Sequence, residues 1–308
     1  MTHRRPLAAL ALLAALVSTP ALAQTSAKQL FGAVEDAAPL PPAPYGSYAN
    51  GCAAGSERLE EDGPRWQAMR LSRNRNWGQP ILVDYLKDLA ADAPGVGWNG
   101  LLVGDLAQPR GGPMLTGHAS HQIGLDADIW LTPMPDRRLT AEEREEISAT
   151  SMLVDGTRTL DKAKFTPAHA SIIKRAASDD RVARIFVHPA IKQGLCEMAP
   201  ELGAGETAWL RRVRPWYGHH YHFHVRLSCP PGASQCRNQD PPPAGTGCGS
   251  DLSYWLSDAP WTPKGPPASR VVVREKTLAS LPNACRGVLT AGGRLLEVAI
   301  PTPRGRGE

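Results

Sequence analysis

Apolar residues recur along the chain with either helical or extended spacing. Between positions 80 and 90, Ile81, Leu82, Tyr85 and Leu89 fall on one side of a helix, which predicts an amphipathic helix. Short apolar runs bounded by polar or turn residues predict buried strands. These runs cover residues 101–106, 125–130, 182–187 and 221–227.

Three further helices are predicted from the residues at which they begin. Thr140-Ala141-Glu142-Glu143 has the spacing of a capping box, and Thr166-Pro167 puts proline at the first helical position. Another helix is expected over residues 189–198, carrying Cys196. Together these elements predict an α+β fold, a single domain with a central antiparallel sheet flanked by helices and disulfide-tethered loops.

The two ends of the chain differ from its middle. A charged start with Arg4 and Arg5, an apolar run over residues 7–17 and the small-residue exit Ala21-Leu22-Ala23 predict a cleavable signal peptide over residues 1–23. That run is too short to cross a bilayer, so we expect an exported protein without a membrane span. Residues 24–50, rich in Ala and Pro, are expected to form an extended, poorly packed entry segment.

The remainder divides into a domain at residues 51–290 and a C-terminal tail at 291–308. Pro and Gly are dense after Cys229, which predicts a disulfide-tethered wrap rather than a second domain. Residues 271–273 and 295–298 are candidate edge strands.

The balance of charge argues against a nucleic-acid partner. The whole chain carries 34 Lys and Arg against 30 Asp and Glu, a formal charge of +4. Removing residues 1–23 takes away Arg4 and Arg5 and no acid, which leaves a net charge of about +2. The remaining length suffices to bury a full core.

Cysteine usage fits an exported protein. All six cysteines follow the predicted signal peptide, and an even count in such a chain predicts three disulfides. Zinc–thiolate ligation is the alternative, but the chain has no Cys-x-x-Cys pair. Cys229 and Cys236 flank a Pro-Gly loop and are natural partners. The cysteines are Cys52, Cys196, Cys229, Cys236, Cys248 and Cys285.

Candidate chemistry is concentrated in two short segments, which hold six of the nine histidines. His121 and Asp128 lie seven residues apart in the first segment, and His222 and His224 lie two apart in the second. Two ligands from one segment and one from another make a three-ligand site, which is typical of catalytic zinc because the fourth position stays open. We take His121, Asp128 and His224 as the predicted ligands.

Neighbouring residues in these segments have predicted supporting roles. His222 shares a strand face with His224 and is suited to move a proton or stabilise an oxyanion. Asp126 is either an acceptor for a ligand imidazole or a solvated side chain. Gly124 is either required for the turn between the ligands or an ordinary turn glycine.

These residues also carry a family resemblance. Ser120-His121-x-x-Gly124-x-x-x-Asp128 with His222-x-His224 resembles the signature of the zinc peptidases grouped around lysostaphin-type enzymes, D-Ala-D-Ala carboxypeptidases and sonic hedgehog. A longer match over residues 112–126, 184–187, 191–192, 213–216 and 224–227 is similar to the penicillin-insensitive murein endopeptidases. This similarity extends from about Cys52 to Cys285.

The resemblance implies a periplasmic zinc peptidase that hydrolyses peptide cross-links of peptidoglycan, chiefly the bond from D-Ala to meso-diaminopimelate. It implies His121, Asp128 and His224 as metal ligands and His222 as a catalytic residue, and His219 also falls on a family histidine.

The same resemblance implies the disulfide pairs Cys52–Cys285, Cys196–Cys248 and Cys229–Cys236. It also implies a homodimer with a second zinc at the dimer contact. His118 and Asp155 are the candidate ligands there, although Arg158 occupies the position where a further ligand is expected.

Three other functions compete with this interpretation. A zinc D,D-carboxypeptidase or dipeptidase would trim terminal residues with the same site. A wall-binding module without activity would lack a ligand or a proton-handling group. A structural secreted domain would carry its histidines incidentally.

Overall fold

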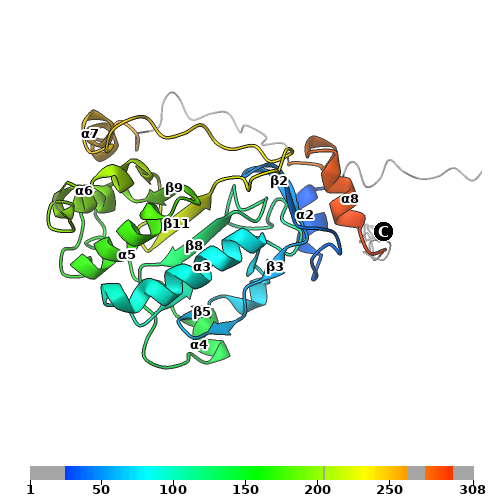
Figure 1. Cartoon of the computed structure of the whole chain (residues 1–308), viewed down its shortest axis with the longest axis horizontal. Coiled ribbons are helices and arrows are strands. Elements are labelled where there is room, and N and C mark those ends of the chain that lie inside the picture. The colour runs from blue at the N-terminus through cyan, green and yellow to red at the C-terminus, as the bar shows by residue number, and fades with distance from the viewer. Residues whose placement is uncertain (1–24, 204, 263–274, 294–308) are drawn as a thin grey trace, which may run out of the picture.

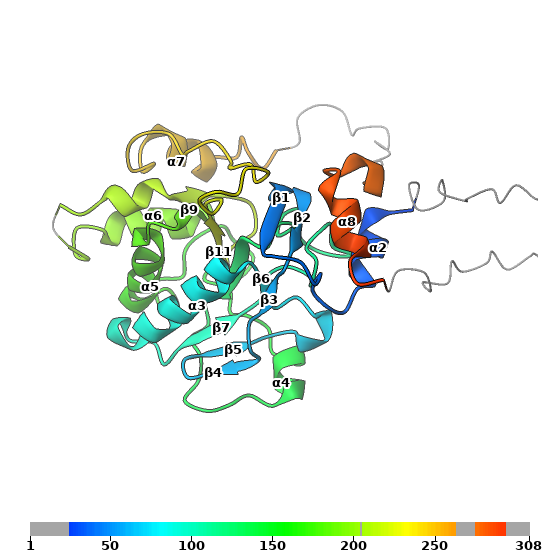
Figure 2. The same ribbon diagram turned by 45° about the vertical axis from the view of Figure 1, so that its right-hand side comes forward.

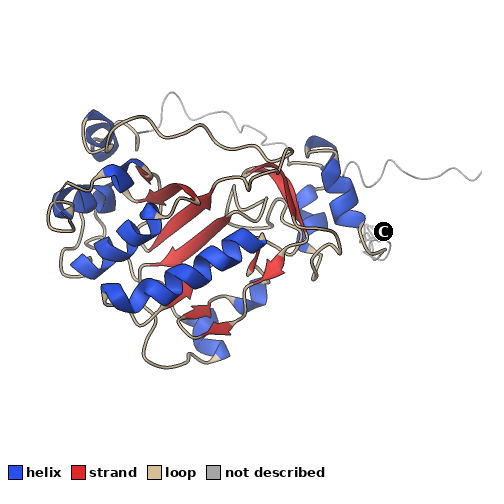
Figure 3. Cartoon of the chain, viewed as in Figure 1, coloured by secondary structure: helices blue, strands red, loops and turns tan. Residues whose placement is uncertain are grey.

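The computed structural model describes residues 25–203, 205–262 and 275–293. Its centre is a seven-stranded sheet in the order β10-β9-β11-β8-β7-β5-β4. Helices α3 and α5 cross one side of this sheet (Figures 1 and 3). The sheet strands are β4 (Asp62–Gly63), β5 (Trp66–Ala68), β7 (Leu101–Val103), β8 (Asp126–Trp130), β9 (Val182–Val187), β10 (Val213–Pro215) and β11 (His222–Leu227).

The remaining elements surround this sheet. Two small sheets pair β1 (Ala43–Ser47) with β2 (Asn50–Ala54) and β3 (Glu57–Arg58) with β6 (Trp77–Gly78). The α-helices of the described residues are α2 (Ala27–Gly32), α3 (Pro80–Asp92), α4 (Ala141–Glu146), α5 (Pro167–Ser178), α6 (Pro189–Met198), α7 (Ser250–Leu256) and α8 (Ala284–Thr290).

The predicted antiparallel sheet is only partly correct, because the sheet is mixed. Strands β9, β11, β8 and β7 pair antiparallel in the middle, as expected. However, β10 pairs parallel with β9, and β5 pairs parallel with β7. A parallel pair needs a crossover, and the chain supplies one through α6 and another through α3.

The helix predictions agree closely with the structure. α3 begins at Pro80 as expected, and α6 has the predicted bounds. The capping box of α4 is complete, with Thr140 and Glu143 each accepting the other's backbone N–H. Pro167 opens α5 at the first helical position. The strand predicted over residues 101–106 is shorter and ends at Val103.

The central sheet has one apolar face and one polar face. On the apolar face, Ala127, Ile129, Phe223, Val225 and Ile185 are fully buried in the main core with side chains from α3, α5 and α6. Because successive side chains of a strand alternate between faces, the intervening residues of β8 and β11 lie together on the opposite face. That polar face carries the predicted site.

The predicted loose entry segment is wrong for residues 27–32, which form α2. Ala27 and Phe31 are completely buried in a second core, built by α2, β2 and α8. This second core lies beside the main sheet, with β1 and β2 between them (Figure 2). Long-range contacts with α8, which lies more than two hundred residues later in the chain, decide this burial.

The second core also supports the turn before the predicted ligand segment. Arg110 caps α8, because its Nη1 donates to the carbonyls of Val288 and Leu289 at 3.0 and 2.6 Å. Gly112 (φ +75°) packs directly on Phe31, and a Cβ there would approach the Phe31 ring to 2.3 Å. A side chain at Gly112 would therefore separate the turn from the second core.

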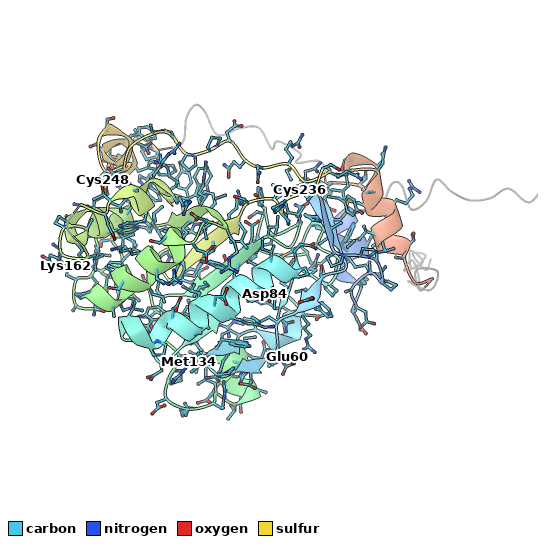
Figure 4. The ribbon with its side chains drawn as sticks, viewed as in Figure 1. Glu60, Asp84, Met134, Lys162, Cys236 and Cys248 are labelled. Carbon is cyan, nitrogen blue, oxygen red and sulfur yellow. A yellow bond between two sulfur atoms is a disulfide. The ribbon has the colours of Figure 1, made fainter. Side chains whose placement is uncertain are left out.

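Two of the three disulfides join elements that are distant in the chain and the third closes a short loop, and all three predicted pairs are confirmed. They are Cys52–Cys285, Cys196–Cys248 and Cys229–Cys236. Cys236 lies near β1 and β2, whereas Cys248 lies at the other end of the extended segment that leads to α7 (Figure 4). The segment between Cys236 and Cys248, part of the predicted wrap, is thus held by a disulfide at each end.

Three sequence-based predictions fall outside the described residues. They are the signal peptide at 1–23 and the candidate edge strands at 271–273 and 295–298. Among the described residues, none of the helices combines the length and apolar character that crossing a membrane requires.

The disulfides are expected to differ in their contribution to stability. Cys52–Cys285 spans 233 residues of sequence, whereas Cys229–Cys236 spans 7. The chain-entropy model then predicts that replacing both members of the first pair by alanine lowers the free energy of unfolding by about 3 kcal/mol more than the same change in the second pair. Guanidinium titration of the two double variants measures this difference. An equal or larger loss for the short loop would contradict the prediction.

Candidate functional site

The site is built on cross-strand pairs of β8 and β11. His222 lies opposite Trp130, His224 opposite Asp128 and Arg226 opposite Asp126. Directly opposed residues of an antiparallel pair have Cβ atoms about 5 Å apart, so each pair is within contact. The alternation that suggested ligands in both segments therefore places them on one face of the sheet.

The third predicted ligand, His121, comes from the loop that precedes β8. Its backbone is left-handed, with φ +67°, and its N–H donates to Asp126 Oδ2 at 3.0 Å. Non-glycine residues rarely adopt this conformation, so a specific contact must stabilise it. Gly124, also left-handed at φ +70°, turns the chain into β8, and a Cβ there would lie 3.0 Å from Gln79 N. The turn between the predicted ligands therefore requires glycine at position 124.

Imidazole nitrogens surround one oxygen of Asp128. Its Oδ1 lies 3.2 Å from His224 Nδ1 and 3.5 Å from the Nε2 atoms of His121 and His222. Despite these distances, Oδ1 is buried and has no hydrogen-bond partner, and neither ring nitrogen of His121 has one. Buried polar atoms are rarely left unpaired. Imidazole nitrogen and carboxylate oxygen are zinc ligands, so this set fits a zinc ion.

His118 approaches the other oxygen of the same carboxylate. Its Nδ1 lies 3.4 Å from Asp128 Oδ2, and its Nε2 lies 3.1 Å from Asp105 Oδ2. Ligand atoms of His118, His121 and Asp128 all fall within 4.8 Å of one another, a spacing suited to one metal ion. His118 is thus a fourth candidate ligand, next to Oδ2 of Asp128, whereas His224 lies next to Oδ1.

Asp126 organises the residues around it. Its carboxylate is fully buried, and its Oδ1 accepts from Arg226 Nε at 2.7 Å and faces His224 Nε2 at 3.0 Å. Burial alone would raise the pKa of Asp126, but Arg226 and His224 together lower it well below its ordinary value. An ionised Asp126 fixes the His224 ring so that Nδ1 points toward Asp128. Asp126 is therefore an acceptor for the His224 imidazole and not a solvated side chain.

His222 and His219 lie beside this cluster. Burial lowers the pKa of His222 to about 4, so its ring is neutral near pH 7, and its buried Nδ1 has no hydrogen-bond partner. His219 has a left-handed backbone with φ +54°, and its ring centroid lies 4.8 Å from that of His222. A neutral imidazole next to the ligand set is suited to accept a proton.

Two cavities flank the cluster on opposite sides. The first, which we call the Asp105 cavity, has a volume of about 320 Å³ and is lined by Arg70, Arg73, Asp105, His118, Tyr221 and His222. The second, the Arg184 cavity, has a volume of about 350 Å³ and is lined by Arg184, Phe186, Trp216, His219, His224 and Trp255. Asp128 borders the first cavity and His224 borders the second.

One predicted residue lies apart from the site. The Asp155 side chain is 94% exposed and lies 3.7 Å from Lys164 Nζ. Arg158 pairs with Asp258 and lies over the Trp261 ring. Within the described part of the chain, Asp155 belongs to no metal-binding group with His118. A second zinc shared between two chains stays a prediction.

Sequence reasoning missed Asp105 and the pairing of Arg226 with Asp126. Asp105 is buried, and its Oδ2 accepts from Arg73 and Arg75 at 3.0 and 2.9 Å. Burial would raise the pKa of Asp105, but His118 and these arginines lower it to about 2. The sequence did contain a signal for Asp105. This carboxylate follows a buried strand by two residues and precedes a glycine-rich turn.

Comparisons with known proteins point to one family. A family model described as penicillin-insensitive murein endopeptidase matches residues 44–290. The penicillin-insensitive murein endopeptidase of Haemophilus influenzae is 43% identical over 254 residues, covering 82% of this chain and 84% of its own. Proteins of that name from Klebsiella pneumoniae and Escherichia coli K12 are each 38% identical and cover 91% of this chain. The chain therefore belongs to the penicillin-insensitive murein endopeptidase family.

Proposed function

We propose that the chain is a zinc-dependent peptidase that hydrolyses the peptide cross-links of peptidoglycan, chiefly between D-Ala and meso-diaminopimelate. The observation that carries the proposal is the buried Oδ1 of Asp128, which has no hydrogen-bond partner although it lies among the ring nitrogens of His121 and His224. Relatives with the corresponding name and nearly the same length support the substrate class.

Zinc would be held by His121, Asp128 and His224. His121 is positioned by its backbone bond to Asp126, and His224 by the bond of its Nε2 to the same carboxylate. When bound, the metal would act as a Lewis acid for water and for the peptide carbonyl. His222, neutral near pH 7, would take the proton released during attack and return it to the leaving amine.

Insensitivity to penicillin follows from this choice of groups. A β-lactam inactivates an enzyme by acylating a nucleophile that would otherwise form an acyl-enzyme. Hydrolysis by zinc and His222 forms no such intermediate on a serine. The proposed mechanism therefore leaves penicillin without a target.

The arrangement of the cavities favours an endopeptidase over a carboxypeptidase. An enzyme that trims a terminal residue needs a closed pocket on one side of the site, whereas an internal cross-link continues in both directions. Here the Asp105 and Arg184 cavities lie on either side of Asp128 and His224. We retain the zinc D,D-carboxypeptidase or dipeptidase as the second candidate because the ligand set is the same.

We also propose that the protein is exported to the periplasm. Three disulfides support an oxidising compartment, where such bonds persist. The charged and apolar start of the chain supports cleavage of a signal peptide after Ala23.

Digestion of purified dimeric muropeptides tests the reaction. We expect monomers with unchanged D-Ala content, identified by mass spectrometry, and we expect the same yield in the presence of penicillin. A chelator should abolish product, and added zinc should restore it. Release of free D-Ala without conversion of dimer to monomer would favour the carboxypeptidase.

Metal content of single variants tests the ligand set. We expect His224→Ala to lose zinc and activity, because it removes a nitrogen aimed at Asp128 Oδ1. His118→Ala is the matched comparison and should keep close to one zinc per chain. Elemental analysis of both folded variants decides the matter. Loss of zinc from His118→Ala alone would instead assign the ligands as His118, His121 and Asp128.

Replacement of His222 separates proton transfer from metal binding. His222→Ala should retain zinc and lower the rate of cross-link cleavage by about 10²–10⁴, the usual effect of losing a general acid–base group. His220→Ala is the matched control, because the His220 ring faces Ser151 Oγ at 2.9 Å. A zinc-free His222→Ala protein would place His222 among the ligands. An unchanged rate would leave His219 as the candidate.

A further inference from the structure

The polar face of the sheet continues beyond the proposed zinc ligands toward β9. Arg184 on β9 lies opposite Arg226, and Phe186 lies opposite His224. Arg184 is therefore diagonal to His224 on the same face, where Cβ atoms are about 7–8 Å apart. The Arg184 side chain, half-buried, lines the cavity that also contains His219 and His224.

The other two arginines of this cavity are already neutralised. Arg226 donates from Nε to Asp126 Oδ1 at 2.7 Å and from Nη1 to Gln239 Oε1 at 2.8 Å. Arg214 pairs with the carboxylate of Asp251. Both cations therefore serve to hold the walls of the cavity.

Arg184 has no such partner. Its guanidinium donates to the backbone carbonyl of Asp240 at 2.8 Å, and none of the described carboxylates forms an ion pair with it. Burial, and then the like charges of Arg226 and Arg214, lower the pKa of Arg184, an effect that the charge of Asp240 offsets only in part. An anion in the cavity would stabilise the charged guanidinium of Arg184 against burial and against the neighbouring cations.

The cavity on the other side of the site differs in this respect. Arg73 pairs with Asp105 at 3.0 Å. Both Nη atoms of Arg70 donate to backbone carbonyls, those of Arg144, Glu145 and Ile147. Of the arginines that line the two cavities within the described residues, Arg184 is thus the one with neither a carboxylate partner nor more than one guanidinium hydrogen bond.

The surroundings of Arg184 strengthen its attraction for an anion. Its guanidinium lies 5.8 Å from the centroid of the Phe186 ring, which also contacts the rings of Trp216 and His224. Trp255 packs on Trp216 with a centroid distance of 5.5 Å, and both rings line the cavity. Aromatic walls limit the access of water, and a charge-assisted hydrogen bond gains strength where water is scarce.

We infer that Arg184 is a specificity-determining residue that binds a substrate carboxylate beside the scissile bond. The inference rests on the proposed function and deepens it. In a cross-link from D-Ala to meso-diaminopimelate, the scissile nitrogen is attached to a carbon that also bears a free carboxylate. The Arg184 cavity would hold this leaving side of the substrate, and the Asp105 cavity would hold the D-Ala side.

Paired substrates test the role of Arg184. One dimeric muropeptide carries the free carboxylate next to the scissile nitrogen, and the other carries its amide at that position. Wild-type protein should cleave the carboxylate form with a kcat/KM about 10- to 100-fold higher, as expected for one charge-assisted contact. Arg184→Gln should lose this preference, mainly through KM, and Arg184→Lys should recover part of it.

Arg211→Gln provides a matched control for structural effects. Arg211 donates to the carbonyls of Pro242 and Pro243, in the same segment as Asp240, but it lies outside the Arg184 cavity. This variant should keep the wild-type preference for the carboxylate. An equal loss of activity toward both substrates in Arg184→Gln, or no loss at all, would overturn the inference.

A binding measurement keeps this test independent of the reaction. Calorimetry with the diaminopimelate-containing product peptide and with its amide at the same carboxylate requires no hydrolysis. Weaker binding of the amide by wild type, and equal binding by Arg184→Gln, would support the carboxylate site even if cross-links were not cleaved. Equal affinity of wild type for both peptides would overturn it. Failure to cleave any cross-link would count against the proposed function alone.

Discussion

The site depends on the ionised carboxylate of Asp126. It is completely buried, so it is stable only because donors surround it: the backbone N–H of His121, the ring of His224 and the guanidinium of Arg226. These donors come from a loop and from β11, whereas Asp126 itself begins β8. One side chain therefore sets the backbone of one proposed ligand and the ring orientation of another. Its removal would leave Arg226 buried without a counter-charge.

A second constraint acts on the loop that carries His121. Gln122 N donates to Tyr48 O at 3.0 Å, and Gly112 N donates to Gln122 O at 2.9 Å. Gly51 N also donates to the Gln122 side chain. The loop is thus held between β8 on one side and β2 with the second core on the other. This support explains how His121 keeps a left-handed backbone, which an isolated loop would rarely adopt.

Much of the site could be predicted because its residue types and spacing are local in sequence. His121 and Asp128, with His222 and His224, fall on two short segments, and strand alternation brings them to one face. Other features depend on contacts between distant segments. Burial of α2 needs α8, and the parallel pairs of the sheet need two crossovers that apolar spacing does not reveal. The role of Asp105 depends on partners before and after it in the chain, which only the fold identifies.

The contact between Gly112 and Phe31 has a consequence for the timing of folding. Phe31 belongs to a core that is complete only when α8 has packed and Cys285 has met Cys52, 233 residues earlier. The loop with His121 is supported by that core. A partly synthesised or reduced chain would therefore have the sheet but lack the support for this loop. Competence to cleave a polymer that the cell needs would then arise as the last step of maturation. The topology of this chain would then delay completion of the site until its last described helix has packed.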